Sequence, residues 1–281
     1  MVGDSLGYRS AHTKSMEWIS VKLSIVTITR NQQEYLTTAI HSVLSARVTN
    51  LQYIIYDAVS TDGTSEIIAQ IDDPRVESVQ RRDEGPADGL NNALRLVDGD
   101  LFGYINGDDF YLPGALEWVI KYFEKHQKVD MIHGGGLIVD AQGNSGRRVF
   151  PRPYSPRLAA LGASFVFQQA TFFRTKSIRD LRFNPANHTC WDGEFVRDLA
   201  LRGAVMRREP VMLGAFRLHP GSISGGPPNP SYLLDRQRLM RETLNSPVRR
   251  SQKVSANFLR GIFYAEGMLR GPGMRLAPGH D

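Results

Sequence analysis

Leu101-Phe-Gly-Tyr-Ile-Asn-Gly-Asp-Asp109 is the stretch of this 281-residue sequence that decides the predicted fold. An apolar run, short enough for a buried strand, is followed directly by two adjacent carboxylates, Asp108 and Asp109. Open α/β sheets bind their ligands at the carboxyl ends of their strands. Because buried carboxylates are costly unless a cation meets them, a hard divalent ion such as Mg²⁺ or Mn²⁺ suits this position. The stretch therefore predicts a site for a metal ion and a diphosphate.

Strand-like and helix-like runs alternate around this stretch. Short β-branched runs predict strands over residues 22–28, 51–56, 76–79 and 101–105. Apolar periodicity predicts helices over residues 33–44, 87–96 and 113–125, and another ending at residue 71. This alternation predicts an α/β fold with a Rossmann-type, mostly parallel sheet flanked by helices.

After residue 130 the pattern changes to shorter strands around turns, which predicts a smaller mixed sheet. Three segments look like short strands around turns: His133-Gly-Gly-Gly136, residues 137–140 and residues 147–150. Further strands are expected over residues 170–174 and 205–216. Helices are expected over residues 191–202, 232–244 and 251–269, a loop or lid over 220–230, and a loose end over 271–281. The chain should divide into a polar leader (1–20), a globular α/β domain (21–225) and a C-terminal helical extension and tail (226–281).

Composition narrows the class of protein. The hydrophobic content of 41% is enough for a sizeable core, and the net charge of +5 lies in the tail, because the first 230 residues carry 25 charges of each sign. Cys190 is the only cysteine, so no intramolecular disulfide can form, and no Cys/His cluster has zinc-ligand spacing. No signal peptide or membrane-spanning run is evident in the sequence, which favours a cytoplasmic location.

These features resemble glycosyltransferase family 2, whose enzymes have the nucleotide-diphospho-sugar transferase (GT-A) fold. The resemblance covers about residues 22 to 224 and rests on the order and spacing of several short segments. The segments are Ser24-Ile-Val-Thr-Ile-Thr-Arg-Asn31, Asp57-Ala-Val-Ser-Thr-Asp-Gly-Thr64, Asp83-Glu-Gly-Pro-Ala-Asp-Gly-Leu-Asn91, Asn106-Gly-Asp-Asp109, Gln168-Gln-Ala-Thr-Phe-Phe173, Asp192-Gly-Glu194 and Arg217-Leu-His219.

The resemblance implies that residues 21–110 bind a nucleotide-diphospho-sugar donor and that residues 111–225 bind the acceptor, a saccharide or lipid-linked saccharide. The donor-binding residues that it implies are Thr27, Thr29, Asn31, Asp57, Asp62, Arg82, Asp83, Asp88, Asn91 and Asp108. Several of these also suit a purely structural role, since Asn31 and Asp62 are good turn or cap residues and Asp88 suits a helix N-terminus. The family often has Asp or Gly after the position of Asp57, where this chain has Ala58 and Val59.

The same resemblance assigns the metal and the catalytic base. It implies that Asp109 binds the divalent ion directly, as part of the counterpart of the family's Asp-X-Asp element, and that His219 completes the metal or diphosphate site. The ion would offset the charge that develops on the leaving diphosphate. Asp192 aligns with the acid that deprotonates the acceptor hydroxyl in inverting relatives. Glu194 is a competing candidate, and Asp192 could instead be a helix cap.

Three secondary features have open interpretations. Gln169, like Gln168, could contact the acceptor sugar or simply begin a strand, and His133 could lie near the acceptor or in a turn. An apolar stripe in residues 254–263, with basic neighbours, could lie on the inner face of an anionic membrane or pack on the catalytic domain. No basic-aromatic or helix-turn-helix pattern indicates nucleic-acid binding.

The predicted activity is an inverting sugar transfer in polysaccharide or glycoconjugate biosynthesis. A non-catalytic nucleotide- or glycan-binding module of the same fold is the main alternative. A dinucleotide-dependent oxidoreductase is disfavoured, because the first turn, residues 27–33, lacks the glycines of the dinucleotide-binding motif. A nucleotidyltransferase is disfavoured as well, because no Gly-rich basic loop follows the first strand.

Overall fold

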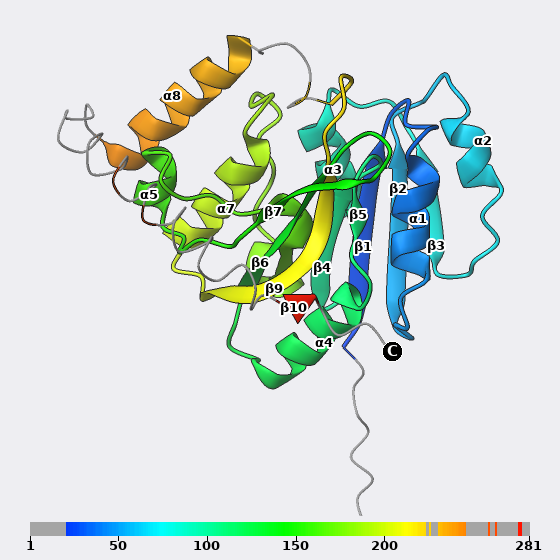
Figure 1. Ribbon diagram of the computed structural model, residues 1–281, viewed down its shortest axis with the longest axis horizontal. Coiled ribbons are helices and arrows are strands. Elements are labelled where there is room, and N and C mark those ends of the chain that lie inside the picture. Colours follow the sequence, from blue (N-terminus) through cyan, green and yellow to red (C-terminus); the bar gives the residue numbers. More distant parts are fainter. Residues whose placement is uncertain are drawn as a thin grey trace, which may run out of the picture.

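A computed structural model describes residues 21–222, 225, 230–245, 258, 262 and 275–276 of the chain (Figure 1). The strands are β1 (Leu23–Thr29), β2 (Leu51–Asp57), β3 (Val76–Gln80), β4 (Leu101–Asn106), β5 (Phe110–Tyr111), β6 (Met131–Val139), β7 (Ser145–Val149), β8 (Thr171–Arg174), β9 (Met206–Arg217) and β10 (Arg275–Leu276). The helices are α1 (Leu36–Leu44), α2 (Thr64–Ala69), α3 (Pro86–Leu94), α4 (Ala115–Lys125), α5 (Pro156–Ala160), α6 (Thr175–Ile178), α7 (Trp191–Leu201) and α8 (Pro230–Leu244).

One sheet runs through this part of the molecule, in the order β10-β9-β6-β8-β4-β1-β2-β3, with β5 paired to β9 and β7 paired to β6. Strands β3, β2, β1 and β4 are mutually parallel, as the sequence predicted. Their register pairs Thr29 with Asp57 and Ile28 with Asn106. The carboxyl ends of β1, β2 and β4 therefore lie together at one edge of the sheet, which is where such sheets bind ligands.

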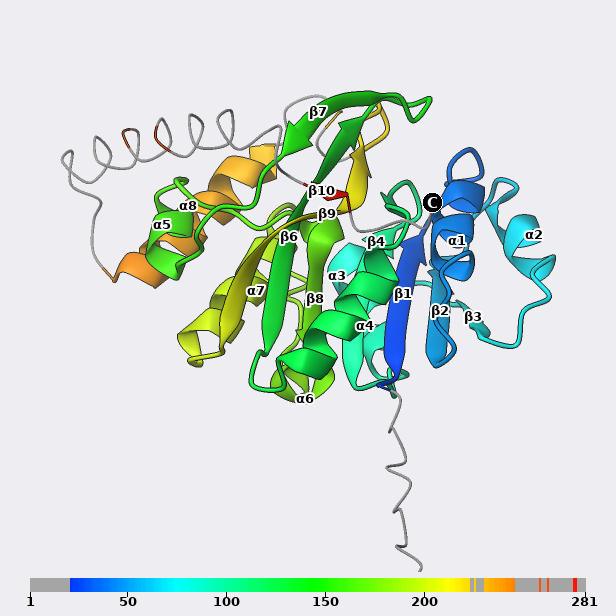
Figure 2. The same cartoon turned by 60° about the horizontal axis from the view of Figure 1, so that its bottom comes forward.

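Helices cover both faces of the sheet (Figure 2). The buried apolar side chains of α1 and α4 belong to one core cluster, and those of α3 and α7 belong to a second cluster. Both clusters draw on alternate residues of the central strands, since neighbouring strand residues point to opposite faces. The result is the three-layer α/β fold predicted from the sequence.

In the second half the same sheet continues with the expected mixture of parallel and antiparallel pairing. A turn at residues 133–136, one of the interpretations left open for His133, is wrong, because β6 runs without interruption through Gly134, Gly135 and Gly136. A Cβ atom at any of these glycines would collide with a neighbouring backbone carbonyl oxygen, that of Val211, Val149 or Gly214. These glycines therefore permit close strand packing instead of forming a turn.

Strand β9 carries the chain back to the carboxyl ends of β1, β2 and β4. It pairs in parallel with β6 along its length, and its end pairs antiparallel with the short strand β5, which places Ala215 opposite Phe110. The residues that follow Ala215, namely Arg217 and His219, are thereby brought beside the turn that carries Asp108 and Asp109.

The described C-terminal elements contact the α/β domain. The helix predicted over residues 232–244 is confirmed as α8, which packs on α5 and is joined to α7 by an ion pair between Arg238 and Glu194. The loose end predicted for residues 271–281 is wrong at Arg275–Leu276, which pairs in parallel with Val211–Met212 as β10. Most of the helix predicted over residues 251–269, and most of the predicted loop at 220–230, lie outside the described residues. No helix in the described part is long and apolar enough to cross a membrane.

His133 gives the fold a pH dependence that can be measured. It is 1% exposed, and burial, followed by the nearby Arg208, lowers the pKa of its imidazole to about 4. The folded pKa is below the unfolded value, so the unfolded chain binds the extra proton, and stability is lost as the pH falls from about 6.5 to about 4. Other buried groups, such as Asp109, titrate in the same range, so the contribution of His133 is read from a comparison of urea unfolding of the wild type and His133→Leu. Between about pH 6.5 and 4 the wild type should change by about 3 kcal/mol more toward instability than the variant. Equal pH profiles of the two proteins would contradict the assignment.

Candidate functional site

Asp109 lies in the acidic turn, residues 107–109, which follows β4, and it is fully buried. Its Oδ2 atom accepts hydrogen bonds from Gln169 Nε2 at 2.8 Å and Asn106 Nδ2 at 3.1 Å, and its Oδ1 atom accepts one from the Arg217 backbone N–H at 3.0 Å. Burial, and then the charge of Asp108, raise the pKa of Asp109. Both carboxylate oxygens are thus held by protein donors, which suits a residue that fixes the turn.

Arg217 holds the backbone of the acidic turn. It is buried at the end of β9 and donates from Nε to the Asp108 carbonyl oxygen at 2.9 Å and from Nη1 to the Ala141 carbonyl oxygen at 2.8 Å. Its guanidinium also lies over the rings of Tyr35 and Phe110, with 4.9 and 5.5 Å to the centroids. Both the hydrogen bonds and the aromatic contacts hold the backbone of the acidic turn in place.

Asp108 forms the second half of the site with His219. The imidazole Nε2 of His219 lies 3.0 Å from Asp108 Oδ2, and both side chains are more than nine-tenths buried. The ring of Tyr35, directly before α1, packs against the His219 ring with 4.6 Å between centroids and a tilt of 45°. Residues 111 positions apart in the sequence are therefore brought to one point.

These side chains fit a divalent ion only if the substrate supplies further ligands. Among the described residues, no three His, Cys, Asp or Glu side chains gather to hold a metal ion on their own. Mg²⁺ and Mn²⁺ sites commonly use one or two protein ligands and complete their coordination with water and substrate phosphates. The carboxylate of Asp108 and the imidazole of His219 are suitable donors of this kind. This differs from the sequence-based prediction, in which Asp109 is the direct ligand, because Asp109 is buried and already bonded.

A cleft of about 900 Å³ borders this pair. It is lined by the loop from residue 30 to 35, by Asp62 and by residues 219–221. This volume lies within the range of small-molecule sites. His219 is shared between the cleft and the acidic turn, so the cleft opens beside Asp108.

The loops after β1 and β2 are tied together along this cleft. Asn31, at a positive φ of 53°, accepts a hydrogen bond at Oδ1 from the Thr61 N–H at 2.8 Å. Asp62 accepts hydrogen bonds from the backbone N–H groups of Gln33 and Thr64, as a turn and cap residue does.

Asp57, at the end of β2, is also bonded within the protein. It is 2% exposed and accepts hydrogen bonds from Ser60, Ser65 and Gln80. The contacts of Asn31, Asp57 and Asp62 thus give all three residues a role in shaping the loops after β1 and β2.

Residues 82–91 lie around the start of α3. Arg82 is exposed, Asp83 accepts from the Gly85 N–H, and Asp88 accepts from the Glu84 N–H and from Asn92. Burial is the main cause that raises the pKa of Asp83. Asp88 closes the helix start, the simple structural interpretation left open by the sequence.

Asn91 has a structural role that can be tested. Its buried side-chain amide exchanges two hydrogen bonds with the Phe183 backbone, from Nδ2 to the carbonyl at 2.8 Å and from the Phe183 N–H to Oδ1 at 2.9 Å. Asn91→Ala leaves both backbone groups unsatisfied and should cost about 2 kcal/mol of unfolding free energy in urea denaturation. Nucleotide affinity measured on the folded variant should not change; a weakened affinity at unchanged stability would instead favour the predicted donor contact.

Two acids begin α7, and their surroundings differ. Asp192 is half-buried and accepts from the Gly193 N–H at 2.7 Å, and burial raises the pKa of its carboxyl. Burial alone would raise the pKa of Glu194 too, but hydrogen bonds from Arg238, Asn187 and Asn184 outweigh it and lower the pKa to about 2. Glu194 is therefore a weak base held in an ion pair. Asp192 is the better proton acceptor of the two.

Aromatic packing joins the start of α7, next to Asp192, to strand β4. The neighbouring Trp191 packs on Tyr104 of β4 with 5.9 Å between centroids and on Phe183 with 5.7 Å. Strand β4 is the strand that ends in Asn106. Packing on β4 therefore ties the start of α7 to the strand that delivers Asp108.

The structure leaves some predicted residues away from this arrangement. Thr27 is fully buried, with its hydroxyl 2.9 Å from the Tyr53 hydroxyl in the core, and His133 is buried in β6. Gln169, in the short turn Gln168–Ala170, bonds Asp109 and is thus a neighbour of the acidic turn rather than a free acceptor contact. Thr29 is at the edge, where its buried Oγ1 has no hydrogen-bond partner among the described residues.

Sequence reasoning assigned no role to two residues of the site. Arg217 stands two residues before His219 at the end of a strand, so strand alternation could have placed both side chains on one face. Tyr35 directly precedes α1, whose apolar residues form a regular core face. No feature of the sequence distinguishes Tyr35 from these core residues.

Comparisons with known proteins agree with this geometry. The sequence model described as Glycosyl transferase family 2 matches residues 24–208. EpsE of Bacillus subtilis is 31% identical over 170 residues, which cover 57% of this chain and 61% of EpsE, so the chain spans less than two thirds of that relative. The GalNAc(5)-diNAcBac-PP-undecaprenol β-1,3-glucosyltransferase of Campylobacter jejuni is 27% identical over 216 residues, covering 70% of this chain and 69% of that enzyme.

A solved structure shares the fold. The mannosyltransferase PcManGT from Pyrobaculum calidifontis, in complex with GDP-Man and Mn²⁺, superposes with a TM-score of 0.55 at 14% sequence identity, over 88% of this chain and 81% of that one. The fold is therefore GT-A, as the resemblance implied. Since the family match spans well over half of the residues and includes the Asp108–Asp109 turn, the chain belongs to glycosyl transferase family 2.

Proposed function

We propose that the protein is an inverting glycosyltransferase, which moves a sugar from a nucleotide-diphospho-sugar to an acceptor hydroxyl. The observation that carries this proposal is the Asp108–His219 pair, 3.0 Å apart beside a cleft of about 900 Å³ at the carboxyl end of β4. PcManGT, which shares the fold, is described in complex with a nucleotide-sugar and Mn²⁺. Asp108 and His219 would hold Mg²⁺ or Mn²⁺, and this ion would supply Lewis-acid stabilisation of the leaving diphosphate.

In the proposed single displacement reaction, different residues bind the donor and deprotonate the acceptor. Asp108 and His219 hold the diphosphate end of the donor, while Asp109, Arg217 and Gln169 fix the turn that carries Asp108. Asp192 takes the proton from the acceptor hydroxyl, whose oxygen forms a bond to the anomeric carbon as the bond from that carbon to the diphosphate oxygen breaks. Attack from the opposite face inverts the configuration.

The environment of Asp192 supports its role as base. A carboxylate at a helix start is normally made less basic by the helix dipole, but burial raises the pKa of Asp192. A higher pKa makes the ionised carboxylate a better proton acceptor. The first turn of α7 therefore combines a fixed position with useful basicity.

The acceptor that we propose is a saccharide hydroxyl, in the assembly of a polysaccharide or another glycoconjugate. The lipid-linked acceptor in the name of the Campylobacter jejuni relative supports a lipid-linked saccharide as one form of it. Asp57, the acid that the resemblance places beside the nucleobase, already accepts hydrogen bonds from Ser60, Ser65 and Gln80. A panel of different nucleotide-sugars therefore identifies the nucleobase.

Turnover of nucleotide-sugars tests this function. The protein is incubated with UDP-, GDP- and dTDP-sugars and Mn²⁺, and release of the nucleoside diphosphate is followed. We expect release from sugars of one nucleotide, and loss of that release with a chelator. A protein that binds a nucleotide-sugar but never releases its diphosphate, with water or with added saccharides, would instead be the non-catalytic module.

A further inference from the structure

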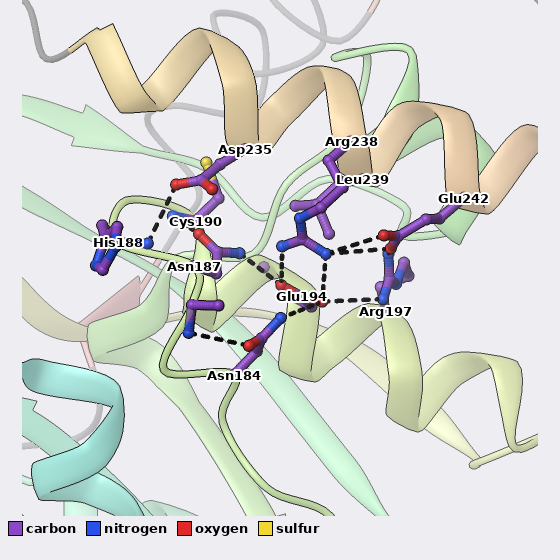
Figure 3. Close-up of polar contacts among 12 residues, drawn as sticks. Asn184, Asn187, His188, Cys190, Glu194, Arg197, Asp235, Arg238, Leu239 and Glu242 are labelled. Carbon is purple, nitrogen blue, oxygen red and sulfur yellow. Dashed lines mark hydrogen bonds and ion pairs between the residues drawn. The ribbon is translucent and has the colours of Figure 1, made fainter. Parts of the chain in front are cut away.

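The C-terminal helix α8 is attached to the start of α7 by charges rather than by an apolar face. Asp235 is its most buried residue, whereas three of its apolar side chains, Tyr232, Leu233 and Leu234, are 45%, 60% and 67% exposed. Figure 3 shows Asp235, Arg238 and Glu242 of α8 pointing toward α7 and the loop before it. Contacts of this kind specify a position more strictly than an apolar surface does.

The main contact is a two-bond ion pair with Glu194. Arg238 donates from Nη1 to Glu194 Oε1 at 2.9 Å and from Nη2 to Oε2 at 2.6 Å (Figure 3). The Glu194 side chain is only 6% exposed. Arg197 and Glu242 complete an alternating charge cluster, since Arg197 contacts both acids and Glu242 also contacts Arg238. The planar guanidinium of Arg238 therefore fixes both the distance and the orientation of Glu194.

The loop that leads into α7 is held at the same time. Asn184 and Asn187 donate to the two oxygens of Glu194, at 3.2 and 2.7 Å. From α8, Asp235 accepts from the His188 N–H at 3.1 Å and the Thr189 hydroxyl at 2.7 Å. The whole approach to Asp192, residues 184–190, is thus anchored to Glu194 on one side and to α8 on the other.

Glu194 is two residues from Asp192 in the same first helical turn. We propose that Arg238 is a positioning residue for catalysis: through Glu194 it holds the start of α7 so that Asp192 faces the acceptor hydroxyl. This inference rests on the proposed function, because it assumes that Asp192 is the base. It makes α8 a part of the catalytic machinery instead of a detachable extension.

The site of the donor is built from other elements. Asp108 follows β4, His219 follows β9 and the cleft is lined by the loop after β1, and none of these side chains contacts the Arg238–Glu194 pair in the described part of the structure. Loss of Arg238 should therefore slow the chemical step and leave donor binding unchanged. A general loss of fold would weaken both together.

The experiment compares Arg238→Gln, Arg238→Lys and a control, Arg241→Gln, whose side chain is exposed on the same helix. For each full-length variant, kcat and KM are measured with UDP-N-acetylglucosamine, UDP-glucose and GDP-mannose in the presence of Mn²⁺, together with the melting temperature and the Kd of the matching nucleoside diphosphate. We expect Arg238→Gln to lower kcat about 10- to 100-fold with KM and Kd unchanged, since small misplacements of reacting groups cost this much. Arg238→Lys should recover part of the rate, because an ammonium cannot make both parallel bonds, and Arg241→Gln should match the wild type.

A double variant shows whether Arg238 acts through Glu194. If it does, Glu194→Gln combined with Arg238→Gln should lose no more activity than the more damaging single variant. If the losses of activity of the two single variants multiply in the double variant, Arg238 does not act through Glu194. A normal kcat in Arg238→Gln, or an equal decline of kcat and donor binding, would also overturn the proposal. An active wild type with an inactive Asp192→Asn and a fully active Arg238→Gln would overturn this inference alone. A wild type that turns over no donor would overturn the proposed function as well.

Discussion

Replacing Asp192 by asparagine is expected to lower the rate of sugar transfer about 10²- to 10⁴-fold, the usual contribution of a general base. The change removes the proton-accepting group but keeps its shape, so the Kd of the nucleoside diphosphate in the presence of Mn²⁺ should be unchanged. Stability should not fall either, because burial raises the pKa of Asp192 and its charged form is therefore disfavoured by folding. The rate of nucleoside diphosphate release and the melting temperature are the two measurements.

Asp180→Asn is the matched control, since Asp180 is an exposed aspartate in the same half of the molecule. It should have wild-type activity. Full activity in Asp192→Asn would show that Asp192 is not the catalytic base. Glu194 would be a poor replacement for Asp192, because the Glu194 pKa of about 2 makes this carboxylate a weak proton acceptor. The non-catalytic interpretation would then gain support.

Asp108→Asn is expected to have the second large effect, on the donor side. The amide cannot supply the charge that a divalent ion requires, and His219 alone is a weak site. We expect loss of metal-dependent nucleotide binding and a decrease in turnover on the order of 10²- to 10³-fold, the range for removal of one group that stabilises transition-state charge. Calorimetry with UDP or GDP, with and without Mn²⁺, measures the binding, and product release measures the turnover.

The control for this variant is Asp98→Asn, at the opposite end of β4. Asp98 forms an exposed ion pair with Lys22 at 2.7 Å, and its removal should change neither binding nor turnover. If Asp108→Asn retains Mn²⁺-dependent binding while Asp109→Asn loses it, the direct ligand is Asp109, as the sequence resemblance implied. The two variants together therefore identify which carboxylate meets the ion.

Sequence reasoning was most successful where local patterns determine the structure. The alternation of apolar strands and amphipathic helices up to residue 125 gave the parallel sheet, because burial of one face sets a period that can be read locally. It left residues 133–136 open between a strand and a turn, because glycine is common in turns. There the glycines serve the close approach of β9 and β7 to β6, a contact with residues far along the chain.

The candidate site, too, could be predicted from local sequence segments only in part. Asp108, Asp109 and His219 were predicted as site residues because their segments stand in a known order, and the structure brings the three together. The roles that we propose for the two aspartates depend on Gln169 and Arg217, which come from distant parts of the chain. The choice between Asp192 and Glu194 was likewise beyond the sequence. It depends on Arg238, 44 residues away from Glu194, whose ion pair lowers the basicity of Glu194.

The most direct test of this account is calorimetric titration of UDP, GDP and dTDP into the wild-type protein, with Mn²⁺ and then with a chelator. The account predicts that one of the three nucleotides binds with Mn²⁺ and that its affinity falls at least about tenfold when the ion is removed. Equal affinity with and without the ion, or no binding of any of the three, would contradict the claim that Asp108 and His219 hold a diphosphate through a divalent ion.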